Sequence, residues 1–568
     1  FVSVSYVPLG IAYLKSYLEK KVPWVSVENA DLSNNFYHRL SLDGFSMHLP
    51  ILCPLCPENK RRTCGGILKR RDYCTLVKVA RFAKSILTDS KTNKFYDVAV
   101  YNKLAQRQEP VYFQISDCLQ RILKHTLEQG RQKDLALLAR SLFKSDIDTI
   151  MVKRPRVVGF SLFSEFQLFY SLALAKILKA KMNPVIIFGG AYIPHLDSQR
   201  LLEMFPSIDF VIYKEGELGI EGILRNLKTK TFDEVPNVVY RKRNSIVENK
   251  ERVLFNLDAI PFPDFSDFDL KNYFLPVPVV ETLFSRGCYW RRCTFCAHHK
   301  TYAHAYRKRS LTNLMCELKR YQKKGIRHFQ FVDELISAKD LLMISTALLE
   351  NKMNMYFYTM ALPRDSFTPE ILKTMYRAGC RMIMWGVESF SQRVLTLMNK
   401  GTNAESVVRI LKDAHQAGIF NFIFMIQGFP TQTEKEIIHE GHILEKNLQY
   451  VDGVSMVSFK LLADAPIFFN RKKFGIRCLK REVILKIGNQ KLFSEKIPFV
   501  CKEKIDWTKI AKRCWFSNGK FTHQIATGER VHLFLHAAHK EQACGKFQNH
   551  KNAQTKCSSI LKAPQNIS

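Results

Sequence analysis

Long hydrophobic segments are absent from this sequence. None of its uninterrupted apolar runs reaches the ~18 residues that a membrane-spanning helix needs, which argues against a transmembrane protein. The first residues, Phe1 to Val4, carry no basic segment and no cleavage-site pattern, so no secretory signal is expected there. The chain also does not begin with Met, which is consistent with a sequence that starts inside a longer natural protein.

Acidic residues are scarce relative to basic ones. The sequence has 52 Asp and Glu against 86 Lys and Arg, a formal net charge of +34. Such a charge suits an anionic partner such as RNA, an acidic peptide or a phosphorylated cofactor. The basic residues are nevertheless spread along the whole chain, which favours the alternative of a Lys-rich solvated surface. The absence of an appended RNA-binding motif disfavours nucleic acid as the partner without eliminating it.

What is present is material for a globular protein of two or three domains. The chain has 568 residues, of which 46% are hydrophobic, enough to form real cores. It also contains 15 cysteines. Because no signal peptide is expected, these cysteines favour metal or redox chemistry over a disulfide framework.

Three of the cysteines lie close together in the sequence. Cys288, Cys293 and Cys296 are spaced C-x4-C-x2-C and follow an apolar run, 277–284, that is expected to form a buried strand. Gly287 allows the backbone to turn sharply after that strand. A strand that ends in such a loop would present thiolates at the mouth of an α/β barrel, where these folds keep their chemistry.

The number of clustered thiols discriminates between metals. A structural zinc site is normally closed by four ligands, whereas an iron–sulfur cubane held by three thiolates keeps one iron open for a substrate or cofactor. The alternative is a zinc knuckle completed by a nearby histidine: His298, His299 or His304.

The segment 285–296 resembles the cluster loop of the radical S-adenosylmethionine superfamily, whose usual spacing is C-x3-C-x2-C. This chain carries one extra residue between the first two cysteines. The resemblance implies a [4Fe–4S] cluster held by Cys288, Cys293 and Cys296, with S-adenosylmethionine on the open iron and a 5′-deoxyadenosyl radical as the product of its cleavage. It also implies that Phe295 lies near the adenine.

Strands and helices alternate through 277–465, which resembles the partial (β/α)6 barrel of that superfamily. Strands are expected at 277–284, 326–332, 355–360, 382–387, 420–426 and 451–459. Helices are expected at 310–324, 341–351, 369–378, 404–417 and 434–447.

Polar motifs follow several of these strands. Asp333 and Glu334 occupy the place where the family holds the S-adenosylmethionine amino group, and a carboxylate there would accept hydrogen bonds from an ammonium. Trp385 to Ser389 resembles the fourth-strand motif, in which Glu388 would contact the ribose hydroxyls. Two further stretches, 399–402 and 428–433, match the family in order.

A second α/β pattern precedes the barrel. Strands are expected at 24–31, 157–161, 184–190 and 209–217, and helices at 116–143, 166–181, 201–205 and from 218. This order indicates a doubly wound, Rossmann-like parallel sheet, whose ligands bind at the carboxyl ends of the strands. Ser161, Gly189 and Gly190 lie at those ends.

This region resembles the cobalamin-binding domain found ahead of many radical S-adenosylmethionine domains. The similar motifs are Pro8-Leu9-Gly10, Val158-Gly159-Phe160-Ser161, Phe188-Gly189-Gly190 and Glu215-Gly216-Glu217. The paired glycines would let the backbone approach a flat corrin, and Ser161 and Ser164 could hydrogen-bond it. No D-x-H-x-x-G motif occurs, so no histidine of that motif would ligate cobalt. A generic Rossmann-like domain with another ligand is the alternative.

The expected domains are a cobalamin-binding-like domain at 1–230 with an insertion at about 35–150, a linker at 231–275, the barrel at 276–465, and a C-terminal extension at 466–568 with a disordered tail. Four cysteines of the insertion could form a structural metal site, but their irregular later spacing favours unlinked thiols: Cys53, Cys56, Cys64 and Cys74.

The pairing of these two domains implies a cobalamin-dependent methyltransferase that acts on an unactivated carbon in a reducing cytoplasm. Three stretches, 358–360, 367–370 and 380–381, resemble branches that mature ribosomally made peptides, which favours a peptide over another small molecule as substrate. A reducing donor such as flavodoxin or ferredoxin is expected. The alternatives are an RNA-modifying radical enzyme and a non-enzymatic zinc-binding scaffold.

Overall fold

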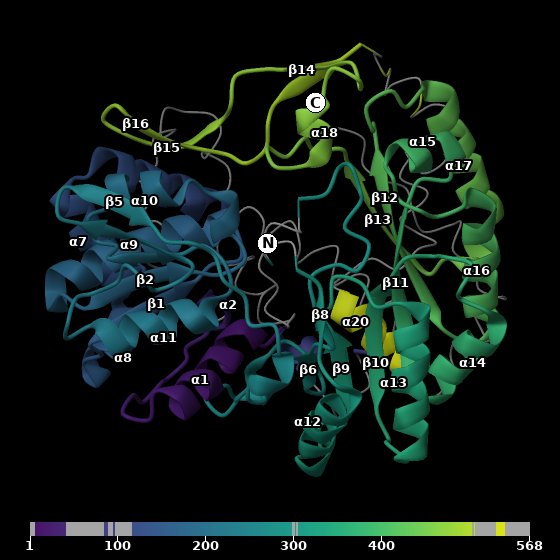
Figure 1. Ribbon diagram of the computed structural model, residues 1–568, viewed down its shortest axis with the longest axis horizontal. Helices are drawn as coiled ribbons and strands as arrows, with labels where there is room; N and C mark the ends of the chain where they lie inside the picture. The colour runs from purple at the N-terminus through teal and green to yellow at the C-terminus, as the bar shows by residue number, and fades with distance from the viewer. Residues whose placement is uncertain are drawn as a thin grey trace.

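The computed structural model describes residues 6–40, 84–88, 95–96, 116–297, 302, 305–502, 505, 510 and 530–539. Two α/β units lie side by side, and a C-terminal extension passes over both (Figure 1). Among the described residues, no helix is long and apolar enough to cross a membrane. The cysteines Cys53, Cys56, Cys64 and Cys74 and the histidines His298, His299 and His304 lie outside the described residues.

The first unit is built on a five-stranded sheet in the order β1-β2-β3-β4-β5. Its strands are β1 (Val157–Ser161), β2 (Val185–Gly189), β3 (Phe210–Ile212), β4 (Val238–Lys242) and β5 (Ser245–Glu248). Three helices follow the parallel strands: α9 (Glu165–Met182), α10 (Ser198–Met204) and α11 (Gly216–Asn226). The α/β class is therefore confirmed. The sheet is mixed, however, because β4 and β5 add to it as antiparallel strands.

Two details of this unit differ from the sequence-based expectations. The stretch 231–275, expected to be a linker without regular structure, contains the β4–β5 hairpin. The stretch 24–31, expected to be a strand, pairs with none of the described strands. Hydrogen bonds to side chains hold this stretch instead, since the Asp267 carboxylate accepts from the Asn29 backbone amide and the Asp31 carboxylate accepts from the Tyr273 hydroxyl.

The helical stretch expected at 116–143 is present but interrupted. Residues 116–129 are helical, the chain turns at Gly130 with φ +65°, and α7 (Gln132–Ser141) and α8 (Lys144–Lys153) follow. Near the start of the chain lies α1 (Leu9–Lys21), and α2 (Leu32–Leu40) follows it. The buried face of α1 packs against the core of the second unit, so α1 lies between the two units.

The second unit is an open barrel of six parallel strands. They are β6 (Val279–Thr282), β9 (His328–Phe331), β10 (Tyr356–Ala361), β11 (Cys380–Glu388), β12 (Phe420–Gln427) and β13 (Gly453–Ser458), in the order β13-β12-β11-β10-β9-β6. Every neighbouring pair is parallel. All six strands expected from the sequence are confirmed.

Helices cover the outer face of this barrel: α12 (Leu311–Lys323), α13 (Ala338–Glu350), α14 (Pro369–Arg377), α15 (Gln392–Leu397), α16 (Ala404–Gln416) and α17 (Glu434–Lys446) (Figure 1). Each begins after a Ser, Thr or Asn whose side chain accepts from a first-turn amide, which fixes where the helix starts. The outer faces of the strands share one core with the apolar faces of α12, α13, α14, α16 and α17. Val394 of α15 packs in a separate cluster with Phe429 and Phe459.

The inner face of the barrel is covered by a helix from the end of the chain, α20 (Arg530–Ala538). The ring of Phe534 lies 4.7 Å from that of Tyr358 on β10, and the Arg530 guanidinium lies 4.8 Å from the ring of Phe424 on β12. The His532 ring nitrogen contacts the Phe274 carbonyl oxygen at 2.9 Å. A region with little sequence signal therefore supplies the core of the barrel interior.

The C-terminal extension contacts both units, and we call residues 462–501 the strap. Near the barrel it contains α18 (Pro466–Phe469) and the antiparallel pair β14 (Ile476–Cys478) and β17 (Phe499–Cys501). Its hairpin of β15 (Val483–Ile487) and β16 (Gln490–Phe493) reaches the first unit, where Leu485 and Leu492 join the core (Figure 1). Further along the strap, Glu495 pairs with Nδ1 of His195 at 2.6 Å.

Candidate functional site

The cysteine loop begins where β6 ends, at the mouth of the barrel. Two short antiparallel strands, β7 (Ser285–Arg286) and β8 (Arg307–Lys308), frame it. Gly287 has φ +83°, and a Cβ there would collide with the carbonyl oxygen of Ala305, so the turn requires glycine. The expected strand, sharp turn and cysteine-bearing loop are therefore present.

The three cysteines of the loop are half-buried. Burial raises the pKa of the Cys293 thiol, and a charge on nearby Cys288 acts in the same direction. Among the described residues, however, no group of three His, Cys, Asp or Glu side chains is arranged to hold a metal ion. Cys288, Cys293 and Cys296 thus share one loop without forming a preassembled cage, and metal ligation by them remains a prediction.

The second half of the loop is tied to neighbouring segments by its backbone. The Thr294 amide donates to the Met398 carbonyl at 2.9 Å, and its own carbonyl accepts from the Ile467 amide of the strap at 2.8 Å. The indole nitrogen of Trp290 donates to the Asn399 carbonyl at 2.7 Å. The segment after α15 and the strap therefore both hold the loop at the barrel mouth.

A buried ion pair lies directly beside the cysteines. Nζ of Lys400 is 2.8 Å from Oε1 of Glu388, and the two residues are only 5% and 8% exposed. Burial by itself would lower the pKa of Lys400, but the charges of Glu388 and Cys293 raise it above its ordinary value. The ammonium also lies 5.5 Å from the Phe295 ring centroid. Lys400 therefore lies between Glu388, at the end of β11, and Phe295 of the cysteine loop, and binding of S-adenosylmethionine by either residue stays a prediction.

The backbone at Glu388 explains how its carboxylate reaches this position. The pairing of β11 with β12 shifts between Gly386 and Glu388, and Glu388 has φ +66°. A non-glycine residue in the left-handed region is uncommon and is typical of functional sites. The motif 399–402 was identified from the sequence, but no partner was expected for its lysine, Lys400. The presence of that lysine in the motif was the only sequence feature that pointed to the ion pair.

Asp333 and Glu334 follow β9, as the sequence indicated, but Asp333 faces the start of the cysteine loop. Its carboxylate accepts from the Phe284 amide at 2.9 Å and from the Ser285 hydroxyl at 2.5 Å. Burial raises the pKa of Asp333 to about 6, although these hydrogen bonds act to lower it. Glu334 is half-buried near Tyr302. These contacts make Asp333 a support for the loop, and contact of either carboxylate with S-adenosylmethionine remains a prediction.

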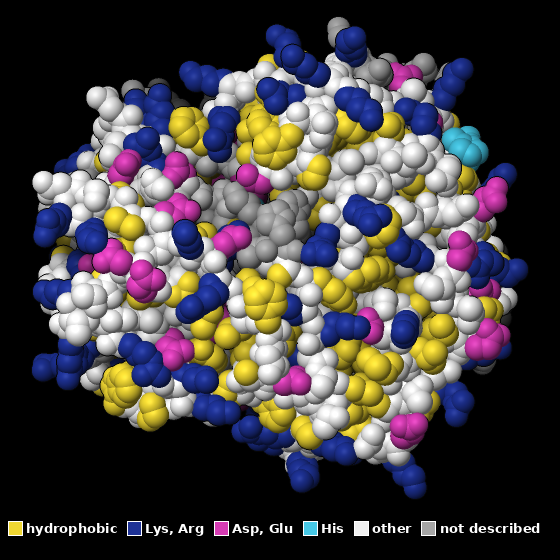
Figure 2. Space-filling view, in the orientation of Figure 1, with side chains coloured by type: hydrophobic (Ala, Val, Ile, Leu, Met, Phe, Trp, Pro, Cys, Tyr) yellow, Lys and Arg dark blue, Asp and Glu magenta, His cyan; other side chains and the backbone are white. Residues whose placement is uncertain are grey.

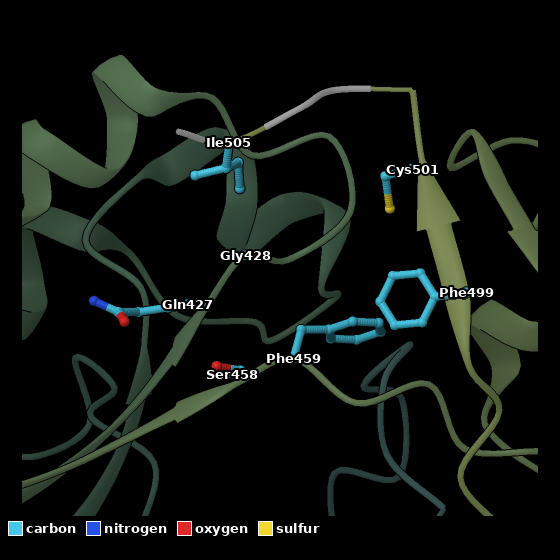
Figure 3. A pocket seen from close by; sticks show the side chains of 7 residues that line it. All are labelled: Gln427, Gly428, Ser458, Phe459, Phe499, Cys501 and Ile505. Atoms are coloured by element: carbon cyan, nitrogen blue, oxygen red, sulfur yellow. The ribbon is translucent and has the colours of Figure 1, made fainter. Parts of the chain in front are cut away.

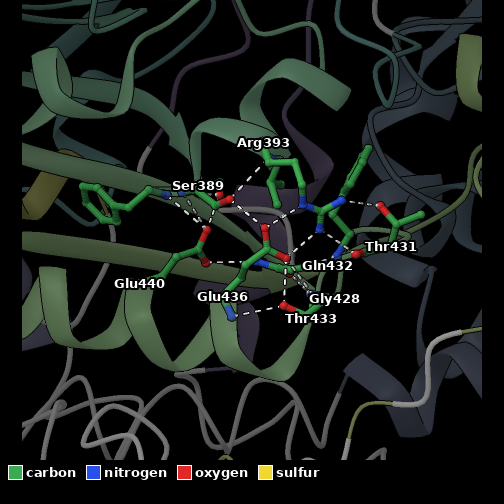
Figure 4. Close-up of polar contacts among 12 residues, drawn as sticks. Ser389, Arg393, Gly428, Thr431, Gln432, Thr433, Glu436 and Glu440 are labelled. Carbon is green, nitrogen blue, oxygen red and sulfur yellow. Dashed lines mark hydrogen bonds and ion pairs between the residues drawn. The ribbon is translucent and has the colours of Figure 1, made fainter.

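A glutamate that sequence reasoning missed joins two of the strand-end motifs. Oε2 of Glu440, on α17, accepts from the Gln432 amide nitrogen at 3.0 Å, and Oε1 accepts from the Ser389 hydroxyl (Figure 4). Gln432 in turn accepts from the Gly428 amide at 2.9 Å. Burial raises the pKa of Glu440 to about 7. Motifs 385–389 and 428–433 are thereby fixed to each other through one buried side chain.

A pocket opens at the carboxyl ends of β12 and β13 (Figure 3). Its lining residues are Gln427, Gly428, Ser458, Phe459, Phe499, Cys501 and Ile505. Gln427 and Ser458 are paired in the register of β12 and β13. Their side chains lie on the same face of the sheet as those of Ile423 and Met425, which pack beneath the outer helices. The pocket therefore lies on the helix side of the sheet.

The carboxyl edge of the first sheet has features that suit a large flat ligand. Ser161 is exposed, Phe163 is 71% exposed, and the buried Ser164 hydroxyl has no hydrogen-bond partner among the described residues. A Cβ at Gly189 would meet nothing closer than 3.7 Å, so this position has room. Gly190, by contrast, has φ +98°, and a Cβ there would collide with the Leu162 backbone, so the fold itself requires this glycine.

Comparison with protein families gives this geometry a context. Residues 282–440 match the model of the Radical SAM superfamily, in which SAM is S-adenosylmethionine. This segment is therefore similar to radical SAM domains. The match spans the cysteine loop, β9 to β12 and most of α17, so the triad, Lys400, Glu388 and Glu440 all lie within it.

Among curated proteins, the uncharacterized methyltransferase PH0819 of Pyrococcus horikoshii is 26% identical over 308 residues. That match covers 53% of this chain and 66% of the relative, so the chain spans about two thirds of it. Two solved structures share the fold. OxsB, a cobalamin-dependent S-adenosylmethionine radical enzyme, has TM-score 0.53 and 18% identity, covering 72% of this chain and 64% of its own.

The second structure is TsrM, a radical S-adenosylmethionine methyltransferase from Kitasatospora setae. It has TM-score 0.56 and 13% identity, and the match covers 74% of this chain and 92% of TsrM. Because both matches extend over about three quarters of this chain, they include the first α/β unit as well as the barrel. The arrangement of a mixed sheet ahead of a radical SAM barrel is therefore a known architecture.

Proposed function

We propose that this chain is a cobalamin-dependent radical S-adenosylmethionine methyltransferase that acts on an unactivated carbon. The observation that carries this proposal is the pairing, in one chain, of a radical SAM domain with a preceding α/β unit in the arrangement shared with OxsB and TsrM. The TsrM structure contains cobalamin and a [4Fe–4S] cluster, and PH0819 is named a methyltransferase.

In this proposal Cys288, Cys293 and Cys296 hold a [4Fe–4S] cluster and leave one iron open. When bound and reduced, such a cluster supplies the electron that cleaves S-adenosylmethionine to a 5′-deoxyadenosyl radical. Lys400 places a buried positive charge beside the thiolates, which favours their ionised, metal-binding form. Glu388, paired with Lys400, would accept hydrogen bonds from the ribose hydroxyls, as the resemblance implies.

The edge formed by Ser161, Ser164 and Gly189 would hold the corrin. When bound, cobalamin supplies a methyl group that can react with a carbon radical, whereas the sulfonium of S-adenosylmethionine reacts with nucleophiles. Gly189 leaves room for close approach, and the Ser164 hydroxyl is available for a hydrogen bond. Because the sequence has no D-x-H-x-x-G motif, we expect bound cobalamin to lack a histidine ligand from that motif.

The substrate proposal is a peptide, with another small organic molecule as the alternative, and flavodoxin or ferredoxin as the electron donor. It rests on the resemblance of 358–360, 367–370 and 380–381 to peptide-maturing branches. Figure 2 shows Lys and Arg side chains scattered over the visible face, with acidic and apolar side chains between them. On this face, a scattered charge of this kind gives no support to an extended nucleic-acid surface.

Product analysis tests the proposal. The anaerobically reconstituted protein is reduced with S-adenosylmethionine and added cobalamin, and 5′-deoxyadenosine and S-adenosylhomocysteine are quantified by mass spectrometry. Both products are expected from the parent, and neither from Cys293→Ala. 5′-Deoxyadenosine formed without S-adenosylhomocysteine, in the presence of candidate peptides, would leave a radical enzyme of another reaction type.

A further inference from the structure

Two arginines that frame the cysteine loop are paired with two glutamates of the first unit. Nη2 of Arg286 donates to Oε1 of Glu217 at 2.6 Å, and Nη1 of Arg307 donates to Oε2 of Glu215 at 2.9 Å. Arg286 also lies 3.7 Å from Glu215, which joins both pairs into one network. We call these four residues the Glu–Arg clamp.

The clamp is buried and its charges balance. The side chains of all four residues are at most 9% exposed, and two carboxylates face two guanidinium groups. Burial alone would raise the pKa of Glu217, but the charge of Arg286 and its hydrogen bond bring it below its ordinary value. Both partners are therefore ionised at neutral pH. An ion pair of this kind contributes little net stability, and geometric registration is its best-attested use.

The two sides of the clamp lie at functionally distinct places. Arg286 is in β7 and Arg307 is in β8, so they occupy the start and the end of the cysteine loop. Glu215 precedes α11 and Glu217 lies in its first turn, directly after β3. The glutamates therefore extend from the carboxyl edge of the first sheet, the edge that carries Ser161 and Gly189.

We propose that Glu215 and Glu217 are positioning residues that set the cysteine loop relative to the carboxyl edge of the first sheet. The motif Glu215-Gly216-Glu217 resembles part of a cobalamin-binding domain, yet its carboxylates point to arginines of the radical SAM domain. They act through Arg286 and Arg307, because the side-chain hydrogen bonds and ion pairs of both glutamates go to these arginines.

The consequence for the reaction rests on the proposed function. A radical formed at the cysteine loop and a methyl group held at the sheet edge must meet at one carbon, and small displacements of reacting groups reduce rates strongly. Weakening the clamp should therefore uncouple the two half-reactions. Cleavage of S-adenosylmethionine needs only the loop, whereas methyl transfer also needs the correct distance between the two units.

The test compares Glu217→Gln with a matched control on the same helix, Glu221→Gln. Glu221 accepts from the Tyr17 hydroxyl at 2.7 Å and from Nε of Arg225 at 2.9 Å, and it has no contact with the cysteine loop in these interactions. Three readouts are used on the reconstituted full chain: amide hydrogen exchange of 285–297, the electron paramagnetic resonance spectrum of the reduced cluster with S-adenosylmethionine, and the ratio of 5′-deoxyadenosine to methylated product.

For Glu217→Gln we expect exchange in 285–297 to be about tenfold faster than in the parent, a changed spectrum, and a several-fold higher ratio of 5′-deoxyadenosine to methylated product. Glu221→Gln should match the parent in all three. If Glu217→Gln yields too little folded protein, the double variant Glu217→Arg, Arg286→Glu provides the test. Its charge-swapped pair should keep amide hydrogen exchange in 285–297 as slow as in the parent.

Equal exchange and equal spectra for Glu217→Gln and Glu221→Gln would overturn the proposal. A charge-swapped double variant whose amide hydrogen exchange in 285–297 is still about tenfold faster than that of the parent would also overturn it. A parent that forms no methylated product would refute the proposed function instead. In that case the exchange and the spectrum still decide whether the clamp positions the loop.

Discussion

The pair of Lys400 and Glu388 gives the sharpest test of how the cysteine loop is supported. In Lys400→Met the long apolar stem is retained and the charge is lost, so Glu388 is left buried with no cation at 2.8 Å. The side chains of the pair are only 7% and 11% exposed. Removing one partner of such a pair typically costs about 3–5 kcal/mol, because the remaining charge is neither solvated nor compensated.

Since Glu388 keeps a small exposed area, we expect the lower part of that range, about 3 kcal/mol. The double variant Lys400→Met, Glu388→Gln removes both charges and should recover most of the loss, which corresponds to a coupling energy of about 2 kcal/mol or more. Lys400 also favours the ionised thiolate of Cys293, so the single variant should lose iron faster after reconstitution.

The assay is urea unfolding of the metal-free chain, combined with iron retention of the reconstituted chain. Arg409→Met is the control, because Arg409 pairs with Asp365 at 2.9 Å on the surface, where such a pair is worth at most about 1 kcal/mol. The reasoning is refuted if Lys400→Met costs no more than Arg409→Met, or if the double variant is as unstable as the single one.

Gly189→Trp should abolish cobalamin binding while S-adenosylmethionine cleavage persists. Equal cobalamin affinity in parent and variant, measured by absorbance titration, would disprove this. Gly189 is chosen over Gly190 because a Cβ at Gly190 would collide with the Leu162 backbone. The pKa of Glu440 is raised from 4.5 to about 7, so its contribution to stability is present below pH 4.5 and is lost as pH rises through 7. The free energy of unfolding of the parent should therefore fall relative to that of Glu440→Gln by up to about 3 kcal/mol between pH 5 and pH 8, and a difference independent of pH would contradict the assignment. Finally, serine replacement of four insertion cysteines should leave cluster iron unchanged, and a lost equivalent of zinc would show that they bind metal: Cys53, Cys56, Cys64 and Cys74.

Much of the barrel could be predicted because its signals are local. Each strand is a short apolar run, and each helix has a capping residue and an apolar stripe, so all six strands were found. That Glu388 ends a barrel strand could also be predicted, since strand ends meet at one edge of a parallel sheet. The contacts of Phe295 and Glu388 with S-adenosylmethionine stay predictions.

What the sequence did not reveal depends on contacts between distant segments. Glu440 has the sequence context of an ordinary exposed glutamate on a helix. Its role as a buried hydrogen-bond acceptor that links two motifs depends on Ser389 and Gln432, which donate to it in the fold. The positive φ of Glu388 follows from the irregular pairing of β11 with β12, which no local pattern records. The placement of α20 inside the barrel depends on Tyr358 and other residues far away in the chain.

The expected strand at 24–31 fails for a related reason. Its composition suits a strand, but it pairs with none of the described strands, and Asp267 and Tyr273 contact it instead. The linker expected at 231–275 contains β4 and β5, because β3 leaves an open edge onto which an antiparallel hairpin can add. In both cases the partner available in the fold decided the outcome.

The most direct test of the central claim is the metal content of one chain. The protein is reconstituted anaerobically with iron and sulfide, supplied with hydroxocobalamin, separated from unbound cofactors by gel filtration, and analysed for iron, sulfide, cobalt and zinc. The account predicts the iron and sulfide of one [4Fe–4S] cluster together with one cobalt per chain. Stoichiometric zinc without iron would contradict the cluster, and a full complement of iron without cobalt would contradict the methyltransferase assignment.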